Sequence, residues 1–131
     1  PLQTPNVRTI TSKAQGKSAG LPTIPEFPNM ITGIIKDPRG NPLGNILVEV
    51  KDREGNPVRA FKTNPLGQFG ASTPLTNGDY TIEFEDPKGM NKFDKIAFTA
   101  SGDIILPIEI LSIDTREELR KSLFNANIGQ D

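Results

Sequence analysis

The stretch from Ile34 to Val50, IIKDPRGNPLGNILVEV, constrains the fold most, because two apolar runs flank a segment that must reverse the chain. In that segment the carboxylate of Asp37 can accept hydrogen bonds from backbone N–H groups two residues further on. Pro38 fixes the φ angle that the first central position of a turn needs, and Gly40 supplies a positive φ at low cost. The sequence therefore predicts a tight reversal between two extended segments.

The residues beyond the reversal have the periodicity of a half-buried strand. Ile46, Val48 and Val50 alternate with residues that are mostly polar, and a period of two places one set on the face of a sheet that points toward a core. The pattern Lys36-Asp37-x-x-Gly40-Asn41-Pro42 returns fifteen positions later as Lys51-Asp52-x-x-Gly55-Asn56-Pro57. A second reversal is expected there.

The rest of the chain has the same character. Among 131 residues there are 12 prolines and 12 glycines, which separate short apolar runs and favour many strands and turns over helices. The runs predict strands at 30–36, 45–51, 58–63, 68–72, 80–85, 93–100 and 104–110. Seven short strands in about 80 residues predict an all-β, seven-stranded β-sandwich of the Ig-like or prealbumin-like kind.

Two of these strands have the clearest alternation. Tyr80, Ile82 and Phe84 are expected on one face of the first, with polar residues between them. In the second, Ile104, Leu106, Ile108 and Ile110 are expected on one face. Pro107 has no N–H group to donate to a ladder, so this last strand should lie at an edge or contain a break at the proline.

Composition excludes several classes of function. A net charge of −1 with the two signs mixed gives no broad positive field for nucleic acid. No apolar run approaches the roughly 20 residues that a membrane helix needs, so we expect no membrane insertion by this chain. The chain has no cysteine and no histidine, which removes thiol nucleophiles, the commonest general base and the commonest zinc ligand. We expect no enzyme activity, no catalytic residues, no cofactor and no metal.

Residues 1–28 form a proline-rich segment, called here the N-terminal arm. It contains Ser, Thr, Gln and Gly without sustained periodicity, which is typical of a solvated linker. The other interpretation is that Leu21, Ile24 and Phe27 dock on the face or edge of a sheet. The sequence leaves both open, and residues 29–113 are expected to form the sandwich.

Residues 114–131 are expected to form a short C-terminal helix followed by a tail. Thr115 and Glu118 have the spacing of a capping box, and acidic residues occupy the first turn. Leu119 and Leu123 form an apolar stripe on a helix too short to be stable alone in water, so the stripe must pack against something. It packs on this domain, on a further element of a longer protein, or on a second copy.

Three motifs in order resemble the carboxypeptidase regulatory-like (prealbumin-like, transthyretin-like) family. They are Gly33-x-Ile35-x-Asp37-x-x-Gly40-x-Pro42-Leu43-x-x-Ile46-x-Val48-x-Val50, Thr63-Asn64-x-x-Gly67-x-Phe69, and Leu75-x-x-Gly78-x-Tyr80-x-Ile82. The resemblance covers about residues 30 to 110. It implies a seven-stranded sandwich that serves larger proteins as a non-catalytic spacer or docking module.

The chain is also similar to the collagen-adhesin B-type domains of bacterial surface proteins, through Gly78-x-Tyr80 and Pro87-x-Gly89-Met90. Those domains commonly form an isopeptide bond between a lysine and an Asn or Asp, assisted by an acid. The lysine position corresponds to Ile35 and the acid position to Phe84, and both are apolar here. The resemblance therefore does not extend to the crosslink.

Other binding sites have weak support in the sequence. Glu83, Glu85, Asp86 and Asp94 lack the loop spacing of a calcium site, and solvated charges on strands are the simpler interpretation. With no Trp and one Tyr, aromatic platforms for sugar are scarce.

The leading hypothesis is a structural spacer or protein-interaction module of a larger, envelope-associated bacterial protein. Its partners would be other domains of that protein or another protein, with no nucleic acid. The alternative is a ligand-binding module for glycan or calcium. A cell-envelope or extracellular location is favoured, while compartment and oligomeric state stay undetermined.

Overall fold

A computed structural model describes residues 7–9, 20–114, 119–120 and 123. These residues form eight β-strands: β1 Val7–Thr9, β2 Thr32–Lys36, β3 Leu47–Lys51, β4 Pro57–Lys62, β5 Gln68–Gly70, β6 Gly78–Glu85, β7 Lys95–Ala100 and β8 Ile108–Leu111. Strands β2 to β8 are the seven that the sequence predicts, and the all-β assignment is confirmed.

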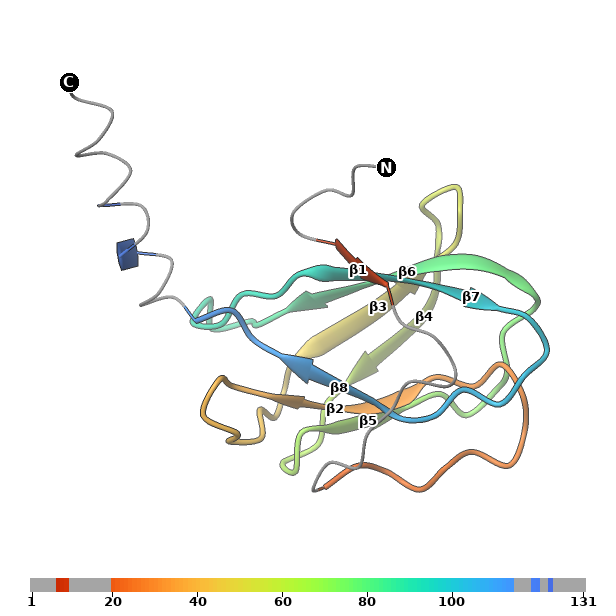
Figure 1. Ribbon diagram of the computed structural model, residues 1–131, viewed down its shortest axis with the longest axis horizontal. Coiled ribbons are helices and arrows are strands. Elements are labelled where there is room, and N and C mark those ends of the chain that lie inside the picture. Colours follow the sequence, from red (N-terminus) through yellow and green to blue (C-terminus); the bar gives the residue numbers. More distant parts are fainter. Residues whose placement is uncertain (1–6, 10–19, 115–118, 121–122, 124–131) are drawn as a thin grey trace.

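The strands form two sheets that stack face to face (Figure 1). The larger sheet has the order β1-β7-β6-β3-β4 and the smaller one has the order β5-β2-β8. The pairs β7–β6, β6–β3, β3–β4 and β2–β5 are antiparallel, whereas β2 pairs parallel with β8 and β1 pairs parallel with β7. The architecture is that of a β-sandwich, as predicted.

The core lies between the sheets and follows the period of two in the sequence. Ile46, Val48 and Val50 are at most 2% exposed, as their alternation predicts. They meet inward-facing residues of β6 and β7 and the apolar side chains of the smaller sheet. The buried cluster consists of Ile31, Ile35, Ile46, Val48, Val50, Phe69, Leu75, Tyr80, Ile82, Ile96, Phe98, Ala100, Ile105, Ile108 and Ile110.

Strand β6 confirms its predicted phase. Tyr80 and Ile82 are buried, and Phe84 is half-buried in contact with the same core. The ring of Tyr80 stacks on Phe98 with centroids 5.5 Å apart, and its hydroxyl donates a hydrogen bond of 2.6 Å to the carbonyl of Thr76. A buried tyrosine whose hydroxyl bonds to backbone a few residues upstream fixes a corner of a β-sandwich.

The last strand differs from the prediction in its start and in part of its phase. Strand β8 begins at Ile108, directly after Pro107, instead of at residue 104. Before the proline the phase is reversed, since Ile105 is 5% exposed whereas Ile104 is 42% exposed. Pro107 cannot donate to the ladder, and β8 lies at an edge of the smaller sheet, which confirms the edge position.

Asn29 connects three loops at one end of the sandwich. Its side-chain amide donates to the carbonyl of Leu75 and to Oδ1 of Asn77, at 3.0 and 2.8 Å, and its Oδ1 accepts from the N–H of Gly102 at 2.8 Å. Its own N–H donates to the carbonyl of Asp103 at 3.0 Å. We call these five residues the Asn29 cluster. Asn29 is 7% exposed and has a φ of 62°, a conformation that asparagine tolerates better than most residues.

Strand β1 lies within the N-terminal arm and was not predicted. It pairs with β7 in parallel, with Val7 opposite Lys95, Arg8 opposite Ile96 and Thr9 opposite Ala97. Further along the arm, the carbonyl of Gly20 accepts a hydrogen bond of 2.9 Å from the side-chain amide of Gln68, on the smaller sheet. The described parts of the arm therefore contact both sheets.

The predicted C-terminal helix falls largely on residues outside the described part of the chain. Of its positions after 114, only residues 119, 120 and 123 are described, and these are helical. The capping box of Thr115 and Glu118 lies outside the described residues, so the helix stays a prediction. In the part of the chain that is described, no helix is long and apolar enough to cross a membrane.

Candidate interaction surfaces

Four segments meet at the end of the sandwich opposite the Asn29 cluster, which we call the exit end. They are the β2–β3 connection 37–46, the β4–β5 connection 63–67, the β6–β7 connection 86–94, and residues 112–114, through which the chain leaves β8. Strands β2 and β8 run parallel and both finish here. The exit end therefore combines exposed loop tips with the point where the chain continues.

Three of the loops at the exit end contain a turn in which the side chain of the first residue accepts hydrogen bonds from backbone N–H groups later in the same turn. Oδ1 of Asp37 accepts from the N–H groups of Arg39 and Asn41, both at 2.9 Å. Oδ1 of Asn64 accepts in the same way from residues 66 and 68, and the carboxylate of Asp86 accepts from residues 88, 90 and 91. The predicted echo at Asp52 forms the same turn at the opposite end. These are Asx turns, whose hydrogen bonds are all local.

Hydrogen bonding keeps the carboxylates of two of these turns ionised. Partial burial of Asp37 acts to raise its pKa, but the hydrogen bonds from Asn41 and Arg39 outweigh it, so the pKa of Asp37 lies below its usual value. The same balance holds for Asp86, where burial is opposed by hydrogen bonds from Lys88, Asn91 and Met90, and its pKa is also lowered. Both carboxylates are occupied by their own turns.

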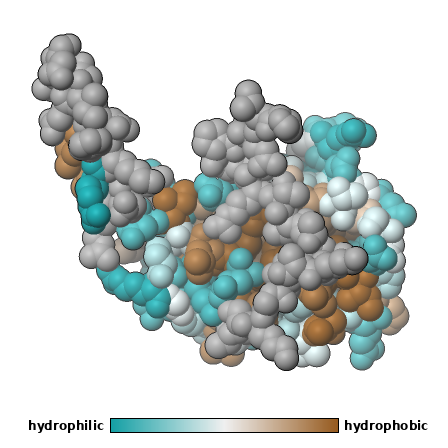
Figure 2. Space-filling view, viewed as in Figure 1, coloured by the Kyte–Doolittle hydropathy of each residue, from teal (hydrophilic) through white to brown (hydrophobic). Residues whose placement is uncertain are grey.

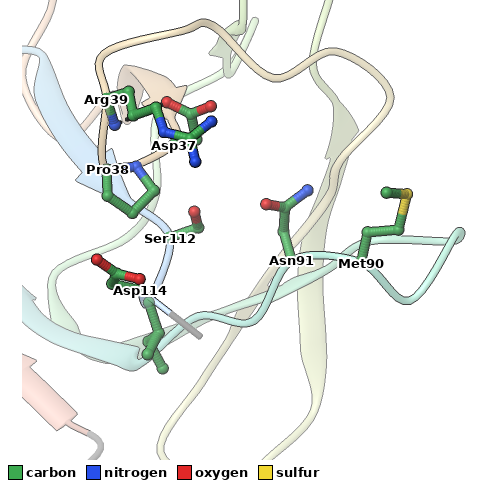
Figure 3. Close-up of a pocket in the computed structure, with 8 residues that line it drawn as sticks. Asp37, Pro38, Arg39, Met90, Asn91, Ser112 and Asp114 are labelled. Atoms are coloured by element: carbon green, nitrogen blue, oxygen red, sulfur yellow. Dashed lines mark hydrogen bonds between the residues drawn. The ribbon is translucent and has the colours of Figure 1, made fainter. Parts of the chain in front are cut away.

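A pocket of about 250 Å³ lies between the loop tips and the departing chain (Figure 3). Its lining residues are Asp37, Pro38, Arg39, Met90, Asn91, Ser112, Ile113 and Asp114. Oγ of Ser112 is buried and has no hydrogen-bond partner among the described residues. The amide of Asn91 donates to Asp86 at 2.9 Å, so most polar groups of the pocket are already engaged.

Two backbone hydrogen bonds hold the chain where it leaves the sandwich. The N–H of Ser112 donates to the carbonyl of Lys36 at 2.9 Å, and the N–H of Ile113 donates to the carbonyl of Lys92 at 2.8 Å. The first bond joins the departing chain to the smaller sheet and the second joins it to the β6–β7 loop of the larger sheet. The direction of the exit is therefore fixed by both sheets.

The apolar residues singled out in the arm differ in exposure. Leu21 is half-buried, beside Gly20 and its contact with Gln68. Ile24 is 56% exposed and Phe27 is 62% exposed, so both present apolar surface before the chain is anchored again at Asn29. The proposed interaction surface on this side of the molecule is thus carried by Ile24 and Phe27, with Leu21 at its edge.

The apolar pair predicted for the C-terminal helix is also exposed. Leu119 is 61% exposed and Leu123 is 60% exposed. Two loop tips at the exit end add apolar surface, since Leu66 is 62% exposed and Met90 is 71% exposed. Neither residue was predicted to form an interaction surface, because a lone Leu or Met in a turn has no periodicity.

The acidic residues considered for calcium do not form a metal site in the described part of the chain, where no group of three or more His, Cys, Asp or Glu side chains is placed to hold an ion. Glu83 lies on the outer face of the larger sheet, with Lys51 at 3.2 Å and Lys95 at 3.5 Å. Burial acts to raise the pKa of Glu83, but Lys51 and then Lys95 outweigh it and lower the pKa. Glu83 raises the pKa of Lys51 in return. These charged side chains form ion pairs on the outer face of the larger sheet.

The positions that would carry an isopeptide bond are both apolar and face the core. Ile35 is 0% exposed on β2. Phe84 is half-buried, and its ring lies 5.5 Å from that of Phe93. Lys36, the neighbouring lysine, points to the outer face of the smaller sheet and pairs with Glu109 at 2.9 Å.

Comparison with known proteins gives one informative similarity. No family model matches the chain. A segment of 55 residues is 38% identical to serine-aspartate repeat-containing protein F of Staphylococcus epidermidis. The segment makes up 42% of this chain and 3% of that protein, so the chain corresponds to a small part of its relative. The similarity therefore concerns one module, and the activity of the whole relative cannot be transferred to this chain.

Proposed function

We propose that this chain is a non-catalytic β-sandwich module that serves as a structural spacer or docking unit within a larger, envelope-associated bacterial protein. The anchored exit of the chain carries this proposal. The hydrogen bonds of Ser112 and Ile113 to the two sheets make the sandwich a rigid base from which the following segment leaves in one direction. A fixed exit sets the direction in which a following part of the protein would continue, which suits a spacer.

Exposed apolar side chains on both flanks supply the docking surface of the proposal. Ile24 and Phe27 lie before the first strand of the smaller sheet, and Leu119 and Leu123 lie after its last strand. Apolar side chains beside a rigid unit lose exposed area when a neighbouring domain packs on them, which stabilises the contact by roughly 25 cal/mol per Å². The proposed partners are neighbouring domains of the parent protein or another protein.

Two similarities support the location in the bacterial envelope. The matched relative is a serine-aspartate repeat protein, and the motifs around Gly78 and Tyr80 resemble the B-type domains of bacterial surface proteins. An all-β sandwich fits an Ig-like, adhesin-type domain. The finer assignment to the carboxypeptidase regulatory-like family rests on the sequence motifs and is part of the proposal.

A spin label at residue 123 tests the fixed exit. The chain has no cysteine, so Leu123→Cys provides a single attachment point. If the exit is rigid, the label should broaden the NMR signals of one set of loops at the exit end. Ile113→Pro removes the N–H donor to Lys92 and should weaken and spread the broadening, while Asn45→Cys, labelled alone, provides a reference position within the fold. Weak, uniform broadening in the chain that carries only Leu123→Cys would contradict the spacer proposal.

The alternative function, binding of glycan or calcium, makes a different prediction. Titration of isotope-labelled protein with calcium or with oligosaccharides would give reproducible, saturable shifts in one group of residues if the module binds either. The spacer proposal predicts no saturable shifts in either titration. Saturable shifts would replace it with the ligand-binding function.

A further inference from the structure

Among the described residues, strand β7 is paired along only part of one of its two sides. On one side β7 pairs with β6 along Ile96 to Ala100, and on the other side it pairs with β1 along Lys95 to Ala97 only. On that second side, Phe98 to Ala100 have no neighbouring strand in the described part of the chain. An edge with unpaired N–H and C=O groups is a template for another extended segment.

The strand that covers this edge is short and reaches it from far along the chain. Strand β1 has three residues, and its parallel direction means that no tight turn can deliver it to β7. Ten residues separate Thr9 from Gly20, which is bound to Gln68 on the smaller sheet. Pairing between β1 and β7 therefore depends on the sequences of these two strands. No tight turn between them fixes which copy of β1 pairs with a given β7.

Figure 1 places the β1–β7 ladder on the outside of the sandwich, with no other strand beyond β1. Figure 2, in the same orientation, shows apolar atoms exposed in the middle of this face, where Figure 1 places β7 and β8. Large apolar residues that are partly exposed on β8 and the segment before it include Ile104, at 42%, and Leu111, at 38%.

We propose that the β7 edge is a strand-docking site and that the arm of a second copy of this chain occupies it, through residues Val7–Thr9 of that copy. A second copy is the occupant of choice because its arm carries the same segment that already pairs with this edge in the required register. Exchange forms the same ladder between two chains that one chain forms alone, as in domain swapping. The proposal rests on the β1–β7 pairing and is independent of the proposed spacer function.

Exchange should depend on protein concentration. Because β1 and β7 belong to the same chain, the effective concentration of the arm at its own edge is on the order of millimolar, so intramolecular pairing dominates in dilute solution. As the protein concentration approaches this range, or when copies are held close together, the arm of a neighbour competes. The site then links copies of the chain edge to edge.

Disulfide trapping tests this exchange on the full chain. Thr9 and Ala97 are directly opposite each other in the ladder, and the chain has no native cysteine. Thr9→Cys chains are mixed with Ala97→Cys chains at about millimolar concentration and oxidised, and peptide mapping measures the 9–97 disulfide. The register brings residues 9 and 97 side by side, and the double variant described below tests whether a disulfide can form between them, so exchange predicts a heterodimer with this bond.

Three comparisons make the result decisive. Thr9→Cys mixed with Ala60→Cys, which places the thiol on β4 at the other edge of the same sheet, should give about tenfold less heterodimer. Adding Arg8→Pro to the Thr9→Cys chain should lower the yield because proline disturbs the ladder, whereas Gln3→Pro, outside β1, should not.

The double variant Thr9→Cys/Ala97→Cys should close an internal disulfide in dilute solution. A double variant that closes, with a mixture that gives no more heterodimer than the Ala60→Cys control, would overturn the exchange, and a double variant that stays open would overturn the site itself.

Discussion

The two ends of the sandwich are held by different kinds of hydrogen bond. At the exit end the tips around Asp37 and Asp86 are closed by carboxylates that bond to N–H groups two to five residues away. At the opposite end, Asn29 bonds to residues 46 to 73 positions away in sequence and joins three loops. The tips at the exit end are therefore independent turns, whereas the opposite end contains, beside the local turn at Asp52, a cluster that connects distant loops.

The exit end also contains distant connections, which lie beneath the turn tips and include the bonds of Ser112 and Ile113. Oγ1 of Thr63 donates to the carbonyl of Leu43 at 2.7 Å and accepts from the N–H of Ile46 at 2.9 Å. Thr63 is 3% exposed, so this connection belongs to the buried base of the loops. The tips above it can change in sequence or contact a partner without loss of distant hydrogen bonds. If the module docks through these tips, the contact would leave the distant hydrogen bonds of the fold in place.

The largest expected effect is at Asn29. The substitution Asn29→Ala removes three side-chain hydrogen bonds, leaves buried partners unsatisfied, and places alanine at a φ of 62°. We expect the free energy of unfolding to fall by about 4 kcal/mol, since the three lost hydrogen bonds cost about 1 kcal/mol each and the left-handed conformation costs alanine about 1 kcal/mol more. Urea denaturation followed by circular dichroism measures the change.

Asn45 provides the matched control for Asn29. It has the same φ of 62° but is exposed at the exit end. Asn45→Ala should cost only the conformational part, about 1 kcal/mol. Equal losses for the two variants would show that the Asn29 cluster adds nothing beyond backbone strain, and the contrast between the two ends would fail.

A smaller effect is expected from pH at the exit end. The pKa values of Asp37 and Asp86 are lowered in the folded protein by hydrogen bonds from their own turns. A lowered pKa contributes stability that is complete above the unfolded pKa of about 3.9 and is lost as pH falls through the folded value. Stability should therefore decrease on acidification below about pH 4.

The double variant Asp37→Asn/Asp86→Asn isolates this contribution. Asparagine keeps an oxygen that can accept in an Asx turn but does not titrate in this range. The urea midpoint of the variant should change less between pH 5 and pH 3 than that of the parent chain, with the remaining change due to carboxylates such as Glu83. An unchanged acid dependence would show that the turn carboxylates are not selectively stabilised by folding.

The sequence predicts the parts of the fold in which periodicity is uninterrupted. Alternation places Val48 and Val50 in the core, and likewise Tyr80 and Ile82. It fails before Pro107, because apolar residues on both sides of a proline look continuous in the sequence whereas the missing N–H interrupts the strand. Turns are also predictable, since the side chain of Asp37 and the positive φ of Gly40 fix the turn through residues that are close in sequence.

The surfaces are harder to predict, because they arise from segments that are distant in sequence. The pocket beside Ser112 combines two loops and the departing chain, and no short motif relates them. Strand β1 has three residues in a proline-rich arm, too few to show a period of two. Asn29 appears in the sequence as an ordinary turn residue, and only the structure shows that its amide joins Leu75 and Gly102.

Amide hydrogen exchange of the native protein, measured residue by residue by NMR, tests the contrast between the two ends most directly. The account predicts that the N–H groups of Leu75 and Gly102, which bond to Asn29, exchange only through openings nearly as costly as global unfolding. The N–H groups of Arg39 and Asn41, which bond to Asp37, should exchange through local openings that cost far less. Equal protection at the two ends, or stronger protection at Arg39 and Asn41, would contradict the account.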